Sequence, residues 1–334
     1  MNCRVAQLAE LCRNKTDYIQ THNFPDPDAI ASAYGLQKLL FRFGISSKLC
    51  YAGRIDKLSA AKMLQMFGIE MHSYDRLREH MHESDYIICV DSQKNAGNMT
   101  DFIGCEVAAI DHHPIFVESD YLYQDIRITG ACATMIAEYF AEAGFTPDSD
   151  TATALLYGIK MDTLQFTRGV TALDISMFAF LHPLIDRAKM VNLERNNMEF
   201  KDLKAYGAAI ERIKVYDTAG FSCIPFSCPD ALIAAISDFV LSMEEVTIAV
   251  ICACREDGIK LSVRSESAKV HAGELIRDAI KEFGTGGGHA AMAGGLIPRK
   301  NLELLGENPQ EQITKLFLNE LDHIDRSNPL EVCL

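Results

Sequence analysis

An aspartate and two histidines close a short apolar run, Ala108-Ala109-Ile110-Asp111-His112-His113. Residues 106–110 are mainly apolar and β-favouring, which predicts a buried strand. Carboxylates and imidazoles are side chains that bind divalent metal ions and transfer protons. Because side chains alternate along an extended backbone, we expect His112 and His113 to point in different directions, one to a metal and the other to a substrate. A solvated turn at the strand end is the alternative.

A third histidine lies in an irregular loop after the strand predicted over residues 16–21. His22 and Asp26 belong to this loop, in which Pro25 and Pro27 prevent a regular element. Asp28 then precedes a helix predicted over residues 29–40, and we expect Asp28 to be its N-cap. A turn and a cap would explain Asp28 but neither His22 nor Asp26.

Two further aspartates end regular elements. Asp91 follows the apolar, β-rich residues 85–90, and Asp162 follows a helix predicted over residues 149–160 with Ser149 or Asp150 as its cap. An isolated aspartate at a strand end is usually a cap or a loop residue. However, an acid beside the negative end of a helix dipole is unfavourable, so Asp162 predicts a cation partner.

Together these residues have the composition of a binuclear metal site. Carboxylates outnumber imidazoles and no cysteine contributes, which favours Mn²⁺ or Mg²⁺ over a structural zinc. Six side chains exceed the need of one ion, so two ions that share a carboxylate are the natural number. Two such ions can activate water and clamp a phosphoryl group. The candidates are His22, Asp26, Asp28, Asp91, His112 and Asp162.

The surrounding elements predict an α/β protein. Strands that alternate with helices, including one over residues 131–143, indicate a doubly wound, mainly parallel sheet whose ligands collect at the strands' carboxyl ends. Beyond residue 214 the pattern is mixed: strands at 221–226, 246–254 and 259–264, and helices at 229–240 and 271–283. The segment Gly284 to His289 then precedes an expected helix start rich in small residues.

Length and composition limit the alternatives. The 334 residues, 48% of them hydrophobic, are enough for two domains. There is no basic, apolar leader and no run of 18 apolar residues, so we expect neither a secretory signal nor a membrane span. Eleven cysteines without a C-x-x-C pair favour a reducing cytoplasm. The net charge of −14 argues against a groove for long nucleic acid but allows a small anionic substrate.

The order and spacing of the motifs resemble those of the DHH phosphoesterases over residues 15–297. The motifs are His22-x-x-x-Asp26-x-Asp28-Ala29, Val90-Asp91, Asp111-His112-His113 and Gly158-Ile159-x-x-Asp162-Thr163. Arg264-Ser265 and Gly286-Gly287-Gly288-His289 resemble the DHHA1 domain, and the nanoRNase, or bifunctional oligoribonuclease/pAp phosphatase, branch is the most similar. The resemblance implies a DHH catalytic domain over residues 1–186, a helical linker over 187–213 and a smaller α/β DHHA1 domain with a mixed sheet over 214–334.

The resemblance also implies a role for each residue. His22 and Asp26 would hold one metal ion, Asp28, His112 and Asp162 the other, and Asp91 would bridge both. His113 would approach the scissile phosphate and Asp111 would orient its neighbours. The substrate-binding residues would be Arg264, Ser265, Gly286, Gly287, Gly288 and His289.

The implied activity is hydrolysis of short linear oligoribonucleotides and dinucleotides such as pGpG or pApA in a cytoplasmic homodimer, with the substrate between the two domains. Two alternatives stay open within the enzyme class: a 3′-phosphoadenosine 5′-phosphate phosphatase and a cyclic di-AMP phosphodiesterase. A nucleotide-sensing module without turnover is the alternative outside it.

Overall fold

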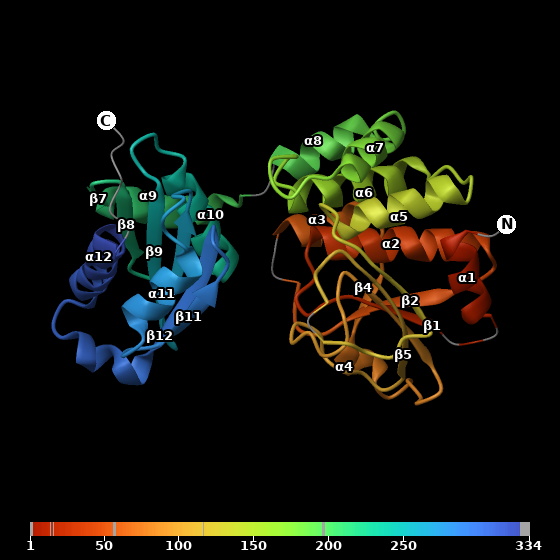
Figure 1. The fold of residues 1–334 in the computed structure, drawn as a ribbon, viewed down its shortest axis with the longest axis horizontal. Helices are drawn as coiled ribbons and strands as arrows, with labels where there is room; N and C mark the ends of the chain where they lie inside the picture. Colours follow the sequence, from red (N-terminus) through yellow and green to blue (C-terminus); the bar gives the residue numbers. More distant parts are fainter. Residues whose placement is uncertain are drawn as a thin grey trace. The chain divides into compact units, whose positions relative to one another are not determined.

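The chain forms two compact units, Met1–Asn197 and Met198–Leu334, each with its own sheet and core (Figure 1). The computed structural model describes residues 3–13, 15, 17–55, 58–115, 117–195 and 198–327. The expected linker, residues 187–213, is divided between the units. Helix α8 (Arg187–Arg195) packs Met190 and Leu193 into the first core, whereas α9 (Leu203–Arg212) packs Ala205 and Ala209 into the second unit.

Six parallel strands build the sheet of the first unit, which confirms the predicted doubly wound arrangement. Their order, β3-β2-β1-β4-β5-β6, reverses direction between β1 and β4. Ligands of such sheets bind at the carboxyl ends of the strands beside this reversal. The strands are β1 (Asp17–Gln20), β2 (Ser47–Tyr51), β3 (Met71–Ser73), β4 (Tyr86–Val90), β5 (Cys105–Asp111) and β6 (Tyr123–Ile126).

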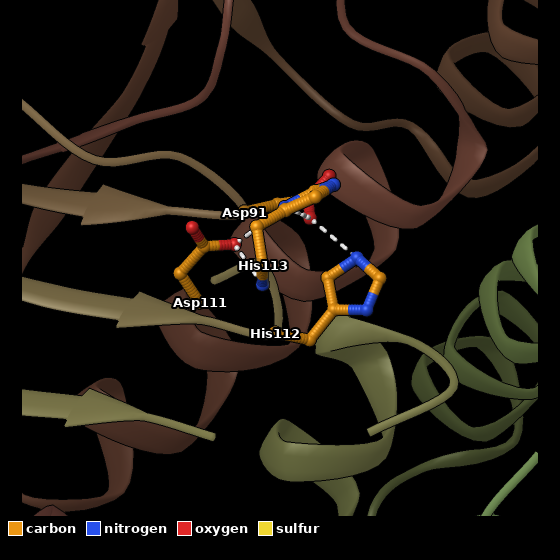
Figure 2. A group of neighbouring side chains, drawn as sticks. All are labelled: Asp91, Asp111, His112 and His113. Carbon is orange, nitrogen blue, oxygen red and sulfur yellow. Dashed lines mark hydrogen bonds and ion pairs between the residues drawn. The ribbon is translucent and has the colours of Figure 1, made fainter. Parts of the chain in front are cut away.

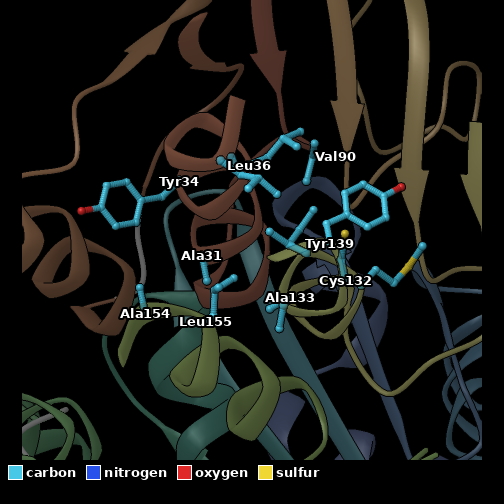
Figure 3. Packing of buried hydrophobic residues seen from close by; sticks show 14 of the residues in the cluster. Ala31, Tyr34, Leu36, Val90, Cys132, Ala133, Tyr139, Ala154 and Leu155 are labelled. Carbon is cyan, nitrogen blue, oxygen red and sulfur yellow. The ribbon is translucent and has the colours of Figure 1, made fainter. Parts of the chain in front are cut away.

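Both faces of this sheet are buried, as the alternation of residues along its strands requires. Ile19 and Val90 pack with helices such as α2 (Pro27–Arg42) and α5 (Cys132–Glu142), as Figure 3 shows around Val90. Tyr18 and Cys89 face a smaller cluster on the other side. The other helices are α1 (Arg4–Leu11), α3 (Leu58–Phe67), α4 (Tyr74–Leu77), α6 (Ser149–Asp162) and α7 (Ala172–Leu181).

Two predicted helix caps were wrong. Helix α2 is capped by Asp26, whose Oδ1 accepts hydrogen bonds from the backbone N–H groups of Asp28 (3.0 Å) and Ala29 (3.1 Å). Pro27 takes the first helical position, so the residue before it becomes the cap. Helix α6 is capped by Asp148, because its first helical residue is Ser149.

The second unit contains the predicted mixed sheet, in the order β11-β12-β10-β9-β8-β7. Only β8 and β9 pair in parallel among its described strands. Helices α9 and α10 (Asp230–Leu241) share one core with β9, and α11 (Ala272–Ile280) and α12 (Pro309–Ser327) share the other. The strands are β7 (Lys214–Tyr216), β8 (Ala219–Ile224), β9 (Ile248–Arg255), β10 (Gly258–Ser265), β11 (Thr285–Gly288) and β12 (Met292–Pro298), and two 3₁₀ helices lie at Phe200–Asp202 and Arg299–Leu305.

The glycine-rich segment is a strand edge rather than the approach to a helix, so that prediction was also wrong. Strand β11 pairs antiparallel with β12, which occupies the place of the expected helix start. A side chain at Gly273 would place its Cβ 2.3 Å from the carbonyl oxygen of Gly288. Glycine is a poor helix former, and here it allows two backbones to approach closely.

Within the described part of the chain, no helix combines the length and the apolar content needed to cross a membrane.

Candidate metal centre

The carboxyl ends of β1, β4 and β5 bring the predicted metal ligands of the first unit together. His22 and Asp26 follow β1, Asp91 follows β4 and His112 follows β5. Asp28 and Asp162 come from α2 and α6. In each of three groups the donor atoms lie within 4.8 Å of one another: His22, Asp26 and Asp91; Asp28, His112 and Asp162; and Asp91, Asp111, His112 and His113. Asp91 and His112 each belong to two groups, so the clusters overlap.

Backbone carbonyls fix the orientation of two histidine rings. His22 Nδ1 lies 2.7 Å from the carbonyl oxygen of Asn23, and His112 Nδ1 lies 3.0 Å from that of Thr129. A carbonyl only accepts, so both Nδ1 atoms donate and the Nε2 atoms face the carboxylates. His22 Nε2 lies 3.5 Å from Asp91, and His112 Nε2 lies 3.3 Å from both Asp91 and Asp162. In the neutral rings, Nε2 would offer its lone pair to a metal ion.

Asp91 is the most constrained carboxylate of the centre. Its backbone is left-handed (φ 55°), a conformation rare outside glycine, and the residue is buried. Its Oδ1 faces the His112 imidazole, 3.3 Å from Nε2, and makes no closer polar contact among the described residues. The charge of a buried carboxylate is costly unless a cation balances it. Burial opposes its charge, but the neighbouring imidazoles of His112 and His22 hold its pKa below the ordinary range.

Asp28 links the centre to α5. Its oxygens accept hydrogen bonds from the backbone N–H groups of Cys132 (2.8 Å) and Ala133 (2.9 Å), at the positive end of that helix. Burial, reinforced by Asp91 and Asp162, raises the pKa of Asp28. Burial likewise raises the pKa of Asp162 against the opposing charge of His112. A bound cation would favour the ionised form of both carboxyl groups.

The donor set fits two divalent ions. Burial disfavours imidazolium, yet hydrogen bonds and charge from the carboxylates raise the pKa of His22 to about 11 and that of His112 to about 10. The raised pKa values show that the carboxylates strongly favour positive charge at this centre. Asp91, with an oxygen towards each histidine, could be shared by both ions. Oxygen-rich donors with two imidazoles suit Mn²⁺ or Mg²⁺.

Asp111 and His113 form a pair beside these ligands (Figure 2). His113 Nδ1 donates to Asp111 Oδ1 at 2.9 Å, and this hydrogen bond is the main reason why the pKa of His113 is raised. His113 also approaches Asp91, at 3.8 Å. The adjacent histidines thus do not point to opposite sides as expected, because the strand ends at Asp111 and alternation stops there. Their hydrogen-bond partners nevertheless differ.

Three residues that orient the side chains of the centre belong to none of the motifs, and the sequence analysis missed them. The buried amide of Gln93 donates to Asp111 Oδ2 at 2.7 Å. Asn23 and Thr129 act through backbone carbonyls, which any residue possesses. Only their positions next to predicted ligands could have indicated them.

The predicted substrate-binding residues lie in the second unit, on β10, on β11 and directly after β11. Arg264 Nε donates to Asp238 Oδ1 at 2.5 Å, and the arginine side chain is 14% exposed. The Ser265 hydroxyl donates to the carbonyl of Val270 at 2.8 Å, while its N–H donates to the carbonyl of Ala291. His289 is exposed and follows the glycines of β11. The structure therefore gives both Arg264 and Ser265 partners within the protein.

Known proteins resemble this chain in sequence and in fold. An uncharacterized protein of Methanocaldococcus jannaschii is 31% identical over 284 residues, which cover 84% of this chain and 57% of that protein. A probable manganese-dependent inorganic pyrophosphatase of Streptococcus suis is 31% identical over 149 residues, which cover 43% and 47%. The chain thus spans about half the length of these relatives. An exopolyphosphatase-related protein from Bacteroides fragilis shares the fold, with a TM-score of 0.76, 19% identity and 97% coverage of both chains.

Two family models match the two units. The model of the DHH family N-terminal domain matches residues 18–159, which include five of the six predicted metal ligands. The DHHA1 domain model matches residues 219–315, which include all the predicted substrate-binding residues. The chain therefore belongs to the DHH family and carries a DHHA1 domain in its second unit.

Proposed function

We propose that this protein is a metal-dependent phosphoesterase that hydrolyses short linear oligoribonucleotides and dinucleotides, such as pGpG or pApA, to mononucleotides. One observation carries the proposal: two overlapping donor sets meet at the buried carboxylate of Asp91, which directs one oxygen towards His22 and the other towards His112. Such a centre suits two divalent ions, which favour attack on phosphorus. The Streptococcus suis relative, named as probably manganese-dependent, supports Mn²⁺ as the ion, with Mg²⁺ as the alternative.

In this proposal the six ligands divide into two sets. His22 and Asp26 would hold one ion, Asp28, His112 and Asp162 would hold the other, and Asp91 would contribute to both. When bound, the ions would lower the pKa of water and neutralise charge on the phosphoryl group. Asn23 and Thr129 keep both Nε2 atoms directed inwards through the carbonyl contacts described above. The ligands are thus oriented before any ion arrives.

His113 is the proposed proton-transfer and phosphate-contacting residue. Its Nδ1 donates to Asp111, so Nε2 is the atom available to a substrate. The side chain is 45% exposed, whereas Asp111 is buried and also fixed by Gln93. Asp111 therefore holds the ring in one orientation and favours its protonated form, which can donate to a phosphoryl or leaving-group oxygen.

The second unit is proposed to bind the distant part of the substrate. Exposed glycines and His289 offer backbone and imidazole groups to a nucleotide. For Arg264, a substrate phosphate would have to replace or share the contact with Asp238.

A substrate panel tests the proposal. Purified protein with Mn²⁺ is incubated with pApA, pGpG, longer RNA, cyclic di-AMP, 3′-phosphoadenosine 5′-phosphate and pyrophosphate. We expect mononucleotides from the linear dinucleotides at the highest kcat/KM, loss of activity with a chelator, and better recovery with Mn²⁺ than with Zn²⁺.

Other outcomes would contradict the proposal specifically. Preference for the bisphosphate, the cyclic dinucleotide or pyrophosphate would assign that substrate class instead. Tight nucleotide binding without any turnover would favour a sensing module. Full activity in exhaustively metal-stripped protein would contradict the metal centre itself.

A further inference from the structure

The chain makes an unusual turn directly after the last candidate ligand, Asp162. Leu164, Gln165 and Phe166 have φ values of 47°, 57° and 64°. Three consecutive left-handed residues without a glycine are rare, because their Cβ atoms crowd the backbone. Strained backbone of this kind persists only where its surroundings fix it, and it is concentrated at functional sites.

Thr163 holds this turn in place. Its hydroxyl donates to the carbonyl of Ile159 at 2.6 Å and accepts from the N–H of Phe166 at 3.1 Å. Its carbonyl accepts from the N–H groups of Thr167 and Arg168, both at 2.9 Å. The ring of Phe166 packs edge-on against a phenylalanine of α7. These contacts fix the backbone of the turn and the direction in which the chain leaves it at Thr167 and Arg168.

The residue that follows the turn, Arg168, places its guanidinium beside the candidate metal centre. Arg168 Nη2 donates to the carbonyl oxygen of Asp162 at 2.9 Å and lies 3.8 Å from its Oδ1. Among the described residues this guanidinium makes no other hydrogen bond, and its side chain is 45% exposed. A guanidinium has five N–H donors, so several are available to a ligand.

Charge makes the position of Arg168 significant. The centre concentrates the carboxylates of Asp26, Asp28, Asp91, Asp111 and Asp162. Arg168 places a positive charge beside one of these carboxylates, 3.8 Å from Asp162. An anionic substrate must approach this acidic region, and an arginine presents a planar fork that matches phosphate oxygens.

We propose that Arg168 is a substrate-binding residue that donates hydrogen bonds to a non-bridging oxygen of the phosphate at the metal centre. This inference rests on the proposed function, because it assumes a phosphate ester as substrate. The strained turn sets the guanidinium beside Asp162, where it can contact the phosphate without being a metal ligand.

Binding measurements separate this role from a merely structural one. The variants are Arg168→Gln, Arg168→Lys and, as a control, Arg76→Gln, which changes an exposed arginine of the same unit. Mn²⁺ binding is followed by electron paramagnetic resonance, and binding of 5′-AMP to the Mn²⁺-saturated protein by calorimetry. Arg168→Gln should weaken AMP binding about tenfold to one-hundredfold, with Arg168→Lys between it and the parent.

The two possible roles of Arg168, binding the phosphate or only holding Asp162, predict different changes in Mn²⁺ affinity. Loss of a positive charge near the ions should leave Mn²⁺ affinity unchanged or slightly higher. If Arg168 only holds Asp162, the variant should bind Mn²⁺ more weakly and AMP normally at saturating Mn²⁺, which would overturn the proposal. Absence of AMP binding by the parent would also overturn it.

The outcome is distinguishable from a failure of the proposed function. A parent that binds Mn²⁺ and AMP but hydrolyses no member of the substrate panel contradicts the proposed function, and the ratio of AMP affinities still decides the role of Arg168. A parent that hydrolyses dinucleotides while Arg168→Gln binds AMP normally contradicts the role of Arg168 alone.

Discussion

His113 Nδ1 lies 2.9 Å from Oδ1 of Asp111, whose other carboxylate oxygen accepts a hydrogen bond from Gln93. The buried carboxylate therefore sets both the direction and the protonation of the exposed ring. Its hydrogen bond is the largest cause of the raised pKa of His113.

Asp111→Asn should lower the pKa of His113 in the metal-free protein. The amide keeps an acceptor for Nδ1–H but loses the charge that favours imidazolium. An NMR titration of the His113 ring should show deprotonation at lower pH than in the parent, and the alkaline limb of kcat/KM should move in the same direction. An unchanged titration would mean that Asp111 does not control this proton.

Asp91→Asn should reduce kcat by roughly a hundredfold or more at saturating Mn²⁺. Loss of a residue that only orients a metal ligand already costs about 10–100-fold, and Asp91 is placed to contact both ions. Asparagine tolerates the left-handed backbone of Asp91, so circular dichroism and melting temperature should change little. Asp75→Ala, at an exposed aspartate of the same unit, serves as the control. Activity within tenfold of the parent would exclude Asp91 as a shared ligand.

Mn²⁺ binding should release protons at pH 7. In the metal-free protein, the carboxylates raise the pKa of His22 to about 11 and that of His112 to about 10, so both rings are protonated. Metal ligation requires neutral imidazoles, so roughly two protons should leave as the ions bind. The apparent Mn²⁺ affinity should accordingly rise with pH, because imidazolium competes less as the pH approaches these pKa values. Calorimetry in buffers with different ionisation heats measures the release, and identical heats in all buffers would contradict it.

Gly158→Ala should destabilise the first unit and weaken Mn²⁺ binding. A Cβ at this position would lie 2.9 Å from Cβ of Ala31 and 3.2 Å from Cα of Asp28, where α6 crosses α2. Overpacking of this kind destabilises a protein by about 1–3 kcal/mol. Replacing glycine by alanine within a helix stabilises it by about 1 kcal/mol, so the net effect should be a loss of stability. Gly207→Ala is the matched control, because nothing lies within 4 Å of its added Cβ on α9. That variant should gain about 0.4–1 kcal/mol. Equal unfolding free energies for both variants would contradict close packing at Gly158.

The convergence of the candidate metal ligands was predictable, because acids and histidines at the ends of strands in a doubly wound sheet meet beside its reversal. Asp26 and Asp28 are both suitable N-cap residues, and Pro27 at the first helical position favours Asp26, a local signal that the prediction of Asp28 overlooked. The contact of Asp28 with the N–H groups of Cys132 and Ala133, more than a hundred residues away, was not predictable, because such long-range contacts leave no local pattern in the sequence.

Two further features had no sequence signal for physical reasons. The left-handed turn at Leu164, Gln165 and Phe166 contains no glycine or asparagine, so the usual indicators of positive φ are absent. The glycines of β11 form an edge strand because β12 pairs with them. Glycine has a low intrinsic preference for strands, and tertiary pairing outweighs it here.

Arg264→Ala should lower kcat/KM more for dinucleotides than for longer RNA. If Arg264 and His289 bind the distant end of a short substrate, a longer chain has to leave them and uses them less. A charge-assisted hydrogen bond to phosphate contributes about 1.5–3 kcal/mol, and sharing the guanidinium with Asp238 reduces that contribution.

The control for Arg264→Ala is an arginine that also pairs with an aspartate but has no proposed contact with the substrate. Arg255→Ala meets this condition, because Arg255 forms ion pairs with Asp230 and Asp257 in the same unit. We expect kcat/KM for pApA to fall about tenfold in Arg264→Ala and to stay near the parent value in Arg255→Ala. The fall in kcat/KM for longer RNA should be smaller, so the ratio of kcat/KM for pApA to that for longer RNA should decrease in Arg264→Ala. An equal fractional loss on both substrates would mean that Arg264 supports the fold through Asp238 rather than selecting substrate length.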